Sequence, residues 1–331
     1  MNVPVLTIVV PCYNEEEVLF ETTKQLGSML SSLIMEQLAS SESNILYVDD
    51  GSHDKTWTII EDLTHKYHYI KGLKLSRNFG HQKALLAGLE KAEKKADCVI
   101  SIDADLQDDI SVIRDFMVKY FEGNDIVYGV RKSRDTDSFF KKATAQGFYR
   151  FMNKIGVKII YNHADYRLLS KRALRELLLF REQNLFLRGI VSLIGLKTTE
   201  VYYDRKDRFA GVSKYPLKKM LAFAFDGITS FSVIPIRIIT IMGFISFFIS
   251  GLAGIYALVV KFMGHAESGW TSIIISIWFI GGLLLMSVGL IGEYIGKIYE
   301  ETKHRPRYSI ETDLYSKESN RDKSLIKTGS N

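Results

Sequence analysis

Apolar runs and amphipathic segments alternate along the first 130 residues of the chain. Short apolar runs predict strands at 5–11, 44–50, 72–76, 97–103 and 125–130. The segments between them, such as 81–95, carry apolar residues at steps of three and four, which predicts amphipathic helices. Strands that are apolar along most of their length are typical of a mostly parallel sheet with helices on both faces. This part of the chain is therefore expected to adopt an α/β fold.

The pattern changes in the second half of the chain. Residues 138–200 are expected to be mostly helical, and 201–204 to form one more short strand. Segment 217–234 is too mixed in polarity to cross a membrane, and it predicts an amphipathic helix at a membrane interface. After residue 292 the chain carries charges of both signs, and its last fifteen residues are expected to be disordered.

Two stretches, 238–260 and 270–292, contain no charged residue over 23 residues each. About 20 such residues cross a bilayer as a helix, so each stretch is long enough to span; a pair of buried core helices is the alternative. Nine residues join them, which predicts an antiparallel hairpin. Six Lys and Arg precede the hairpin within 205–219 and four follow it within 297–307, whereas its loop offers only Lys261. The positive-inside rule therefore places both termini in the cytoplasm.

Composition and the N-terminus narrow the class of protein further. The net charge of +5 is modest for 331 residues and gives no reason to expect a nucleic-acid partner. The only two cysteines, Cys12 and Cys98, lie in apolar runs without a metal-binding or disulfide pattern, so they are expected to be buried free thiols in a reducing compartment. The first 17 residues lack the basic start and the apolar length of a signal peptide.

Polar residues follow four of the five predicted strands. In parallel sheets the ligand site lies outside the carboxyl ends of the strands, so these residues are expected to share one edge. The densest group is ISIDADLQDD, residues 100–109, where four carboxylates need a nearby cation. In an extended chain Asp103, Asp105 and Gln107 project the same way, which suits one Mg²⁺ or Mn²⁺ that also binds a diphosphate.

Six motifs in order resemble the inverting glycosyltransferases of family 2. They are VVPCYNEEE, VDDGS, LSRNFGHQKALLAGL, IDADLQD, DYRLLS and RFAGVSKYP, and with the hairpin they look like the polyprenyl-phosphate branch, which includes dolichol-phosphate mannose synthases and bactoprenol glucosyltransferases. The resemblance covers about residues 5–230 of the catalytic part. It implies a GT-A fold, that is, a Rossmann-like, mostly parallel α/β domain that binds a nucleotide sugar.

The resemblance also assigns roles to single residues. The nucleoside pocket would be lined by Pro11, Tyr13 and Glu15, and Asp50 would reach the base. Asp103 would lie by the ribose and the metal. The metal ligands would be Asp105 and Gln107. Asp165 would occupy the family's base position; a structural carboxylate paired with Arg167 is the alternative. Many relatives have prolines where this chain has Asp109 and Ile110, which alters a loop and no ligand. His81 and His163 lie near motifs and are expected to be ordinary polar residues.

The implied acceptor is a lipid monophosphate. Its second pKa is about 6, so at neutral pH it is largely dianionic and already nucleophilic. The site then needs cations more than a strong base, and the candidates are Arg131, Arg208 and Lys214, with Arg134 and Arg205 as weaker ones. Attraction to anionic lipid headgroups is the alternative role for each of these residues.

The expected reaction is transfer of one sugar from a UDP-sugar to undecaprenyl phosphate, with inversion at the anomeric carbon. Glucose is favoured as the sugar and N-acetylglucosamine comes next, but nothing in the residues decides the donor, and GDP-mannose stays open. A processive polysaccharide synthase is disfavoured because no tryptophan completes a QxxRW motif. A membrane tether that only binds nucleotide sugar is disfavoured by the acidic and basic residues described above.

The expected organisation has four parts. They are a cytosolic GT-A domain at 1–216, the interface helix at 217–234, a two-helix membrane hairpin at 235–296 and a cytosolic charged tail at 297–331. Small residues in the hairpin, among them Gly243, Gly251 and Gly289, permit close helix packing and predict a homo-oligomer in the cell membrane. A cytosolic product further implies a flippase and a downstream glycosyltransferase as partners.

Overall fold

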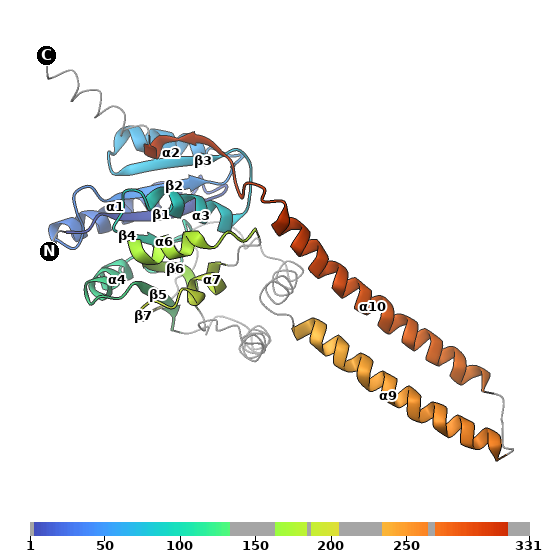
Figure 1. The fold of residues 1–331 in the computed structure, drawn as a ribbon. Helices are drawn as coiled ribbons and strands as arrows, with labels where there is room; N and C mark the ends of the chain where they lie inside the picture. The colour runs from blue at the N-terminus through green and yellow to red at the C-terminus, as the bar shows by residue number, and fades with distance from the viewer. Residues whose placement is uncertain (1–2, 133–162, 184–186, 205–233, 264–268, 317–331) are drawn as a thin grey trace. The chain divides into compact units, whose positions relative to one another are not determined.

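The computed structural model describes residues 3–132, 163–183, 187–204, 234–263 and 269–316 (Figure 1). These residues form two compact units. One is a sheet with its helices, and the other holds the helices α9 (Ile234–Phe262) and α10 (Trp270–Thr302). The last fifteen residues, and the predicted interface helix at 217–234 except for its final residue, lie outside the described residues.

The described strands form one sheet in the order β7-β5-β6-β4-β1-β2-β3-β8. Their bounds are β1 (Leu6–Cys12), β2 (Asn44–Asp49), β3 (Ile70–Leu75), β4 (Cys98–Ser101), β5 (Ile126–Arg131), β6 (His163–Ser170), β7 (Thr198–Tyr203) and β8 (Ile310–Asp313). β6 and β8 run antiparallel to their neighbours, and the other strands share one direction. The expectation of a mostly parallel α/β sheet is therefore confirmed.

Helices cover the sheet because its central strands are apolar on both faces. The helices of this unit within the described residues are α1 (Leu19–Met35), α2 (Thr56–Lys66), α3 (His81–Ala92), α4 (Val112–Phe121), α6 (Lys171–Leu179) and α7 (Leu187–Leu193). Every residue of β1 is buried: Ile8 and Val10 join a core that α1, α2 and α4 share, whereas Val9 faces α3. A Cβ on Gly88 of α3 would lie 2.4 Å from Val9 Cγ1, so only glycine allows this close approach.

The expectation that 138–200 is mostly helical is wrong at β6. This strand inserts between β4 and β5 and pairs antiparallel with both. Its sequence, HADYRLLS, carries two charged residues that the folded protein buries, Asp165 and Arg167, and they pair with each other. A strand whose charged residues are neutralised inside the fold does not give the apolar run that predicts a buried strand.

Strand β8 was not predicted, because it lies in a segment rich in charge. It pairs antiparallel with β3 and closes that side of the sheet (Figure 1). Lys91 Nζ lies 2.7 Å from Asp313 Oδ2, and Lys74 Nζ lies 2.9 Å from Glu311 Oε1. Tyr315, just after the strand, is buried. The chain thus returns to the sheet after α10.

We expect the sheet unit to depend on this returning segment. Ending the chain at residue 308 removes β8 and the buried Tyr315, and it should lower the melting temperature of the sheet unit by about 5–10 °C. Both cysteines lie buried in the sheet, so labelling by a thiol-reactive fluorophore during heating reports on this unit alone. Ending the chain at residue 316 is the matched control and should leave the transition unchanged. Equal melting temperatures for the two truncations would contradict the prediction.

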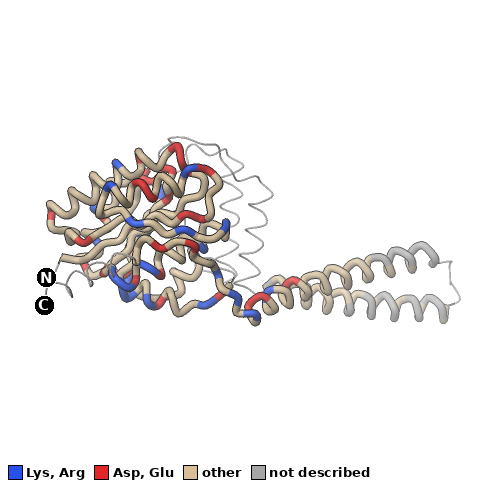
Figure 2. Tube along the Cα trace, turned by 90° about the horizontal axis from the view of Figure 1, so that it is seen from above, with Lys and Arg blue, Asp and Glu red and all other residues tan. Residues whose placement is uncertain are grey.

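Within the described residues, one helical stretch is long and apolar enough to cross a membrane, Phe279–Thr302, which contains an 18-residue window with a mean hydropathy of 1.7. A shorter apolar stretch covers Pro235–Ser246. Along α10 the charged residues gather toward the C-terminal end, from Glu293 onward (Figure 2). Two membrane-spanning helices remain a prediction.

Candidate active site

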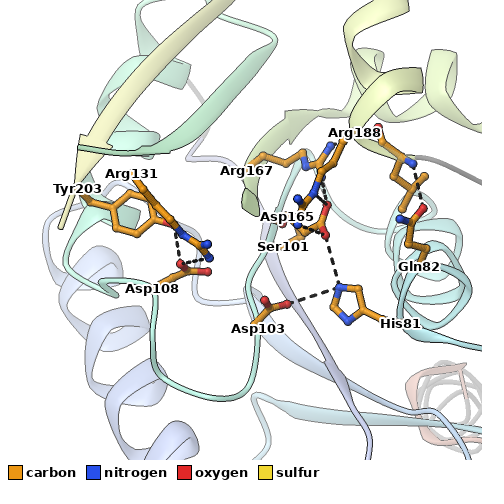
Figure 3. A network of polar contacts seen from close by, with 11 residues as sticks. His81, Gln82, Ser101, Asp103, Asp108, Arg131, Asp165, Arg167, Arg188 and Tyr203 are labelled. Carbon is orange, nitrogen blue, oxygen red and sulfur yellow. Dashed lines mark hydrogen bonds and ion pairs between the residues drawn. The ribbon is translucent and has the colours of Figure 1, made fainter. Parts of the chain in front are cut away.

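The carboxyl ends of the parallel strands bring the predicted residues to one edge of the sheet. Asp103 follows β4, Arg131 ends β5, and Asp49 ends β2. Because β6 runs antiparallel, its first residues reach the same edge, and the pairing of Ser101 with Arg167 sets Asp165 beside the segment that follows β4. Figure 3 shows Asp103 and Asp165 on two different elements, with Arg131 on a third.

His81, the first residue of α3, lies between two of these carboxylates. Its Nε2 is 3.5 Å from Asp103 Oδ1 and 3.7 Å from Asp165 Oδ2 (Figure 3). Burial lowers the pKa of His81, but Asp103 and Asp165 outweigh it and raise the pKa to about 9. His81 is therefore a cation at neutral pH. The sequence predicts an ordinary polar residue at this position, whereas the structure places His81 between Asp103 and Asp165.

Asp165 is surrounded by cations. Its Oδ1 accepts a hydrogen bond from Arg167 Nη2, and its Oδ2 accepts one from Arg188 Nη2 at 3.1 Å. Burial raises the pKa of Asp165, but Arg188, His81 and Arg167 together hold it well below its usual range. Asp165 pairs with Arg167, as the structural interpretation predicts, and its catalytic role stays a prediction. Because its pKa is low, Asp165 is a poor proton acceptor and stays negatively charged beside these cations.

Asp103 differs from Asp165, although the two lie close together. Burial raises its pKa, His81 lowers it, and the carboxylates of Asp108, Asp165 and Asp105 raise it, with a net value of about 6. The excess of negative charge predicted for this segment is thus present in the fold. His81 balances only part of it, and the rest favours a further cation.

The segment after β4 is a folded loop rather than an extended strand. The strand ends at Ser101, and Leu106 adopts a positive φ of 58°. Thr22 of α1 donates a hydrogen bond to the Ala104 carbonyl at 2.8 Å, and Tyr166 donates one to the Asp109 carbonyl at 3.0 Å. The assumption of an extended chain at 103–107 is therefore wrong, because these contacts bend the segment. Alternate residues are nevertheless partly exposed, namely Asp103, Asp105, Gln107 and Asp109.

These residues fit a divalent cation that a diphosphate also binds. In the described part of the chain, no three His, Cys, Asp or Glu side chains converge as a complete metal site. Mg²⁺ bound to phosphates needs only one or two carboxylates, with waters filling its remaining positions. Asp103 and Asp105 supply two partly exposed carboxylates in one loop, which is the number that this requires. Gln107 follows in the same loop, and its backbone N–H donates to Asp105 Oδ1 at 3.2 Å.

A second polar group joins this loop to β5 and β7. Asp108 is buried, and its Oδ1 accepts hydrogen bonds from Arg131 Nη2 at 3.1 Å and from Tyr203 Oη at 2.5 Å (Figure 3). Burial lowers the pKa of Arg131, but Asp108 more than offsets this. Burial and Asp108 raise the pKa of Tyr203. Arg131 thus stays charged, and Tyr203 stays a hydrogen-bond donor.

The residues expected to bind the nucleoside lie at the ends of β1 and β2. Tyr13 and Glu15 follow β1 and are partly exposed, whereas Pro11 is buried. Asp50 is buried as well, and its two oxygens accept the backbone N–H groups of Phe79 at 2.7 Å and Gly80 at 2.9 Å. In this structure Asp50 fixes the entry to α3 and thereby the position of His81.

The residues that sequence reasoning missed are His81 and Arg188. A histidine beside a motif gave a weak signal. Arg188 gave none, because it lies 23 residues from the Asp165 that it contacts. The predicted phosphate ligands Arg208 and Lys214, with Arg134 and Arg205, fall outside the described residues. A hollow of about 590 Å³ lies at the opposite edge of the sheet, lined by residues such as Asp97, Asp125 and Lys171; none of the predicted site residues lines it.

Residues 7–178 match the model of the family "Glycosyl transferase family 2". The chain is also 64% identical over 315 residues, 95% of its length, to a Bacillus subtilis protein named uncharacterized glycosyltransferase YkoT, of which it covers 94%. The chain belongs to glycosyltransferase family 2. The family that the six motifs resemble is therefore confirmed, and with it the expectation of an enzyme that transfers sugars.

Other relatives of this family 2 glycosyltransferase carry more specific names. It is 40% identical over 313 residues to the bactoprenol glucosyl transferase of Shigella phage SfV, covering 93% of this chain and 98% of that one. Among solved structures, glucosyl-3-phosphoglycerate synthase from Mycobacterium tuberculosis with Mn²⁺ and UDP has a TM-score of 0.41 and 16% identity, covering 67% of this chain and 76% of that one. That likeness is too distant to bear on the site.

The pKa of His81 predicts a pH dependence of stability for the glycosyltransferase. An unfolded histidine has a pKa of about 6.5, and folding raises that of His81 to about 9. The stabilising contribution of His81 is therefore complete below about pH 6.5 and is lost as the pH rises through about 9. In metal-free buffer, we expect the melting temperature to fall between pH 7 and 9.5 more steeply for the wild type than for His81→Gln.

Near-ultraviolet circular dichroism of the full chain in detergent measures this difference. The matched control is His65→Gln, at an exposed position on α2, which should keep the pH slope of the wild type. Parallel slopes for the wild type and His81→Gln would show that His81 is not held as a cation.

Proposed function

We propose that this glycosyltransferase moves one sugar from a UDP-sugar to undecaprenyl phosphate with inversion at the anomeric carbon, and that glucose is the sugar. The observation that carries the proposal is the state of Asp165, which two arginines and His81 hold as an anion. A sugar hydroxyl needs a base to remove its proton, whereas a lipid monophosphate is already ionised at pH 7. A site with a weak base and several cations suits the phosphate as acceptor.

The relatives support the same acceptor and sugar. Proteins named bactoprenol glucosyl transferase match this chain over more than nine tenths of its length at about 40% identity. The relative at 64% identity carries no substrate in its name, so it leaves the donor open. We infer a GT-A fold for the sheet unit from the family and from the mostly parallel sheet.

In the proposed mechanism the residues of this chain position two anions. Asp103, Asp105 and Gln107 would hold Mg²⁺ or Mn²⁺, which neutralises the charge that develops on the nucleotide diphosphate. Pro11, Tyr13, Glu15 and Asp50 would form the nucleoside pocket. Arg131, with Arg208 and Lys214, would hold the acceptor phosphate. His81 Nε2 lies between Asp103 and Asp165 and would hold the two carboxylates in place.

We further propose that the enzyme acts at the cytosolic face of the cell membrane. α9 and α10 would cross the bilayer as a hairpin, with the catalytic unit and both termini in the cytosol and 217–234 at the interface. The glycines Gly243, Gly281 and Gly289 have open space where a side chain would lie, which leaves room for a helix of a second copy in a homo-oligomer. A flippase and a downstream glycosyltransferase would use the product.

Sugar transfer by the purified full-length protein tests this function. Undecaprenyl phosphate is incubated with radiolabelled UDP-glucose, UDP-N-acetylglucosamine or GDP-mannose, with and without EDTA, and the organic-extractable label is counted. We expect product from UDP-glucose that EDTA abolishes. Product from GDP-mannose alone would favour a mannose synthase. Binding of nucleotide sugar without product from any donor would favour the tether.

A further inference from the structure

Arg131 is held in one orientation by two buried side chains. Its guanidinium donates from Nη2 to Asp108 Oδ1, and its Nε lies 3.4 Å from Tyr203 Oη. Asp108 and Tyr203 are only 3% and 2% exposed, whereas the side chain of Arg131 is 21% exposed. Two of its nitrogens thus bind inside the protein. No described residue accepts a hydrogen bond from the third, Nη1.

Asp108 connects this arginine to the loop of the predicted metal ligands. It directly follows Gln107 and lies three residues after Asp105. A buried carboxylate is costly unless a cation and hydrogen bonds satisfy it, and Asp108 finds both in Arg131 and Tyr203. The three residues come from the loop after β4, from the end of β5 and from the end of β7 (Figure 3). Their contacts therefore fix Arg131 and the loop relative to each other.

We propose that Asp108 and Tyr203 are positioning residues that orient Arg131 toward the acceptor phosphate. This inference rests on the proposed function, in which Arg131 binds that phosphate. Asp108 satisfies Nη2 and Tyr203 satisfies Nε, so the Nη1 group is directed to a ligand. Because Asp108 shares its loop with Asp105, the acceptor phosphate and the donor diphosphate are held at a fixed separation. A free arginine would lose conformational entropy on each encounter with the acceptor, and a fixed one does not.

The test compares two tyrosine variants on adjacent positions of β7. Tyr203→Phe removes the hydroxyl that binds Asp108 and keeps the ring. Tyr202→Phe is the matched control, because Tyr202 is 54% exposed and donates to Glu200 instead. We expect Tyr203→Phe to raise the KM for undecaprenyl phosphate about three- to tenfold with the KM for the nucleotide sugar unchanged. Tyr202→Phe should change neither KM.

A double-mutant cycle separates positioning from simple support of the fold. Arg131→Gln should raise the KM for the acceptor about ten- to a hundredfold. If Tyr203 acts through Arg131, Tyr203→Phe adds nothing in the Arg131→Gln background. Asp108→Asn is a second test, expected to raise the same KM while the melting temperature stays above the assay temperature.

The outcomes distinguish this inference from the function on which it rests. A wild-type protein that makes no lipid-linked product from any donor overturns the proposed function and this inference with it. An active wild type with an unchanged acceptor KM in Tyr203→Phe overturns the inference alone. An equal rise in the KM values for donor and acceptor, or unfolding of both Tyr203→Phe and Asp108→Asn at the assay temperature, assigns the pair a structural role and likewise overturns it.

Discussion

Replacing Asp105 with asparagine should lower the rate of sugar transfer about a hundred- to a thousandfold. The diphosphate gains negative charge as it leaves, and a preorganised positive charge at that point contributes about this factor to catalysis. Asparagine keeps the size of the side chain and its acceptor for the Gln107 backbone N–H, but it removes the charge that would hold a divalent ion. Initial rates at saturating substrates measure the effect. Titration calorimetry with Mn²⁺ in the presence of UDP should show the loss of metal binding directly.

The charge-matched control is Asp115→Asn. Asp115 lies exposed on α4, ten residues further along the chain, and its replacement should leave both the rate and Mn²⁺ binding unchanged. If Asp105→Asn retained the rate while EDTA abolished it, the ion would have other ligands. Asp103→Asn would then be expected to show the loss.

Replacing Asp165 with asparagine should lower the free energy of unfolding by about 3–5 kcal/mol. Removing one partner of a buried ion pair leaves the other charge buried without compensation, and this uncompensated charge accounts for most of the cost. Here Arg167 is buried, and Arg188 and His81 also lose the anion that they face. Urea unfolding, with labelling of the buried cysteines as the readout, measures the change in the free energy of unfolding of the sheet unit.

Two further variants identify the cause of this cost. Asp313→Asn disrupts the Lys91–Asp313 pair, which has a separation of 2.7 Å but is partly exposed, and should cost no more than about 1 kcal/mol. If uncompensated charge is the cause, adding Arg188→Gln to Asp165→Asn should restore part of the lost stability. A double variant less stable than Asp165→Asn alone would instead indicate that packing dominates.

The sequence predicted those parts of the fold whose signal is local. The apolar runs of β1 to β5 indicated buried strands, and the polar residues after them indicated the edge of the sheet at which both Asp103 and Arg131 lie. The apolar runs and the polar residues that follow them are patterns among residues that are close in sequence. The same reasoning failed at β6 and β8, because Arg167 is buried against Asp165, and because β8 is a short strand in a charged segment that binds a partner far away in sequence.

The site was predicted less completely than the fold, for a related reason. The metal-ligand candidates stand together in ISIDADLQDD and can be found by inspection. The cations beside the carboxylates of the site come from α3, β5, β6 and α7, and only folding brings His81, Arg131, Arg167 and Arg188 to the same edge. Of the four carboxylates in this stretch, Asp108 is paired with Arg131 and Asp103 faces His81, so the protein itself supplies part of the positive charge that they need.

The position of β8 in the chain determines when the sheet can be completed during synthesis. Its partner β3 leaves the ribosome early, but Ile310 follows Leu75 by 235 residues, and α9 and α10 lie in between. At about 5–20 residues per second, the nascent chain holds β3 as an open edge for roughly 10–50 s. Open edges bind chaperones or other chains. The sheet is therefore completed only after both apolar helices have been synthesised. A chain that the ribosome releases early lacks β8 and keeps β3 as an open edge.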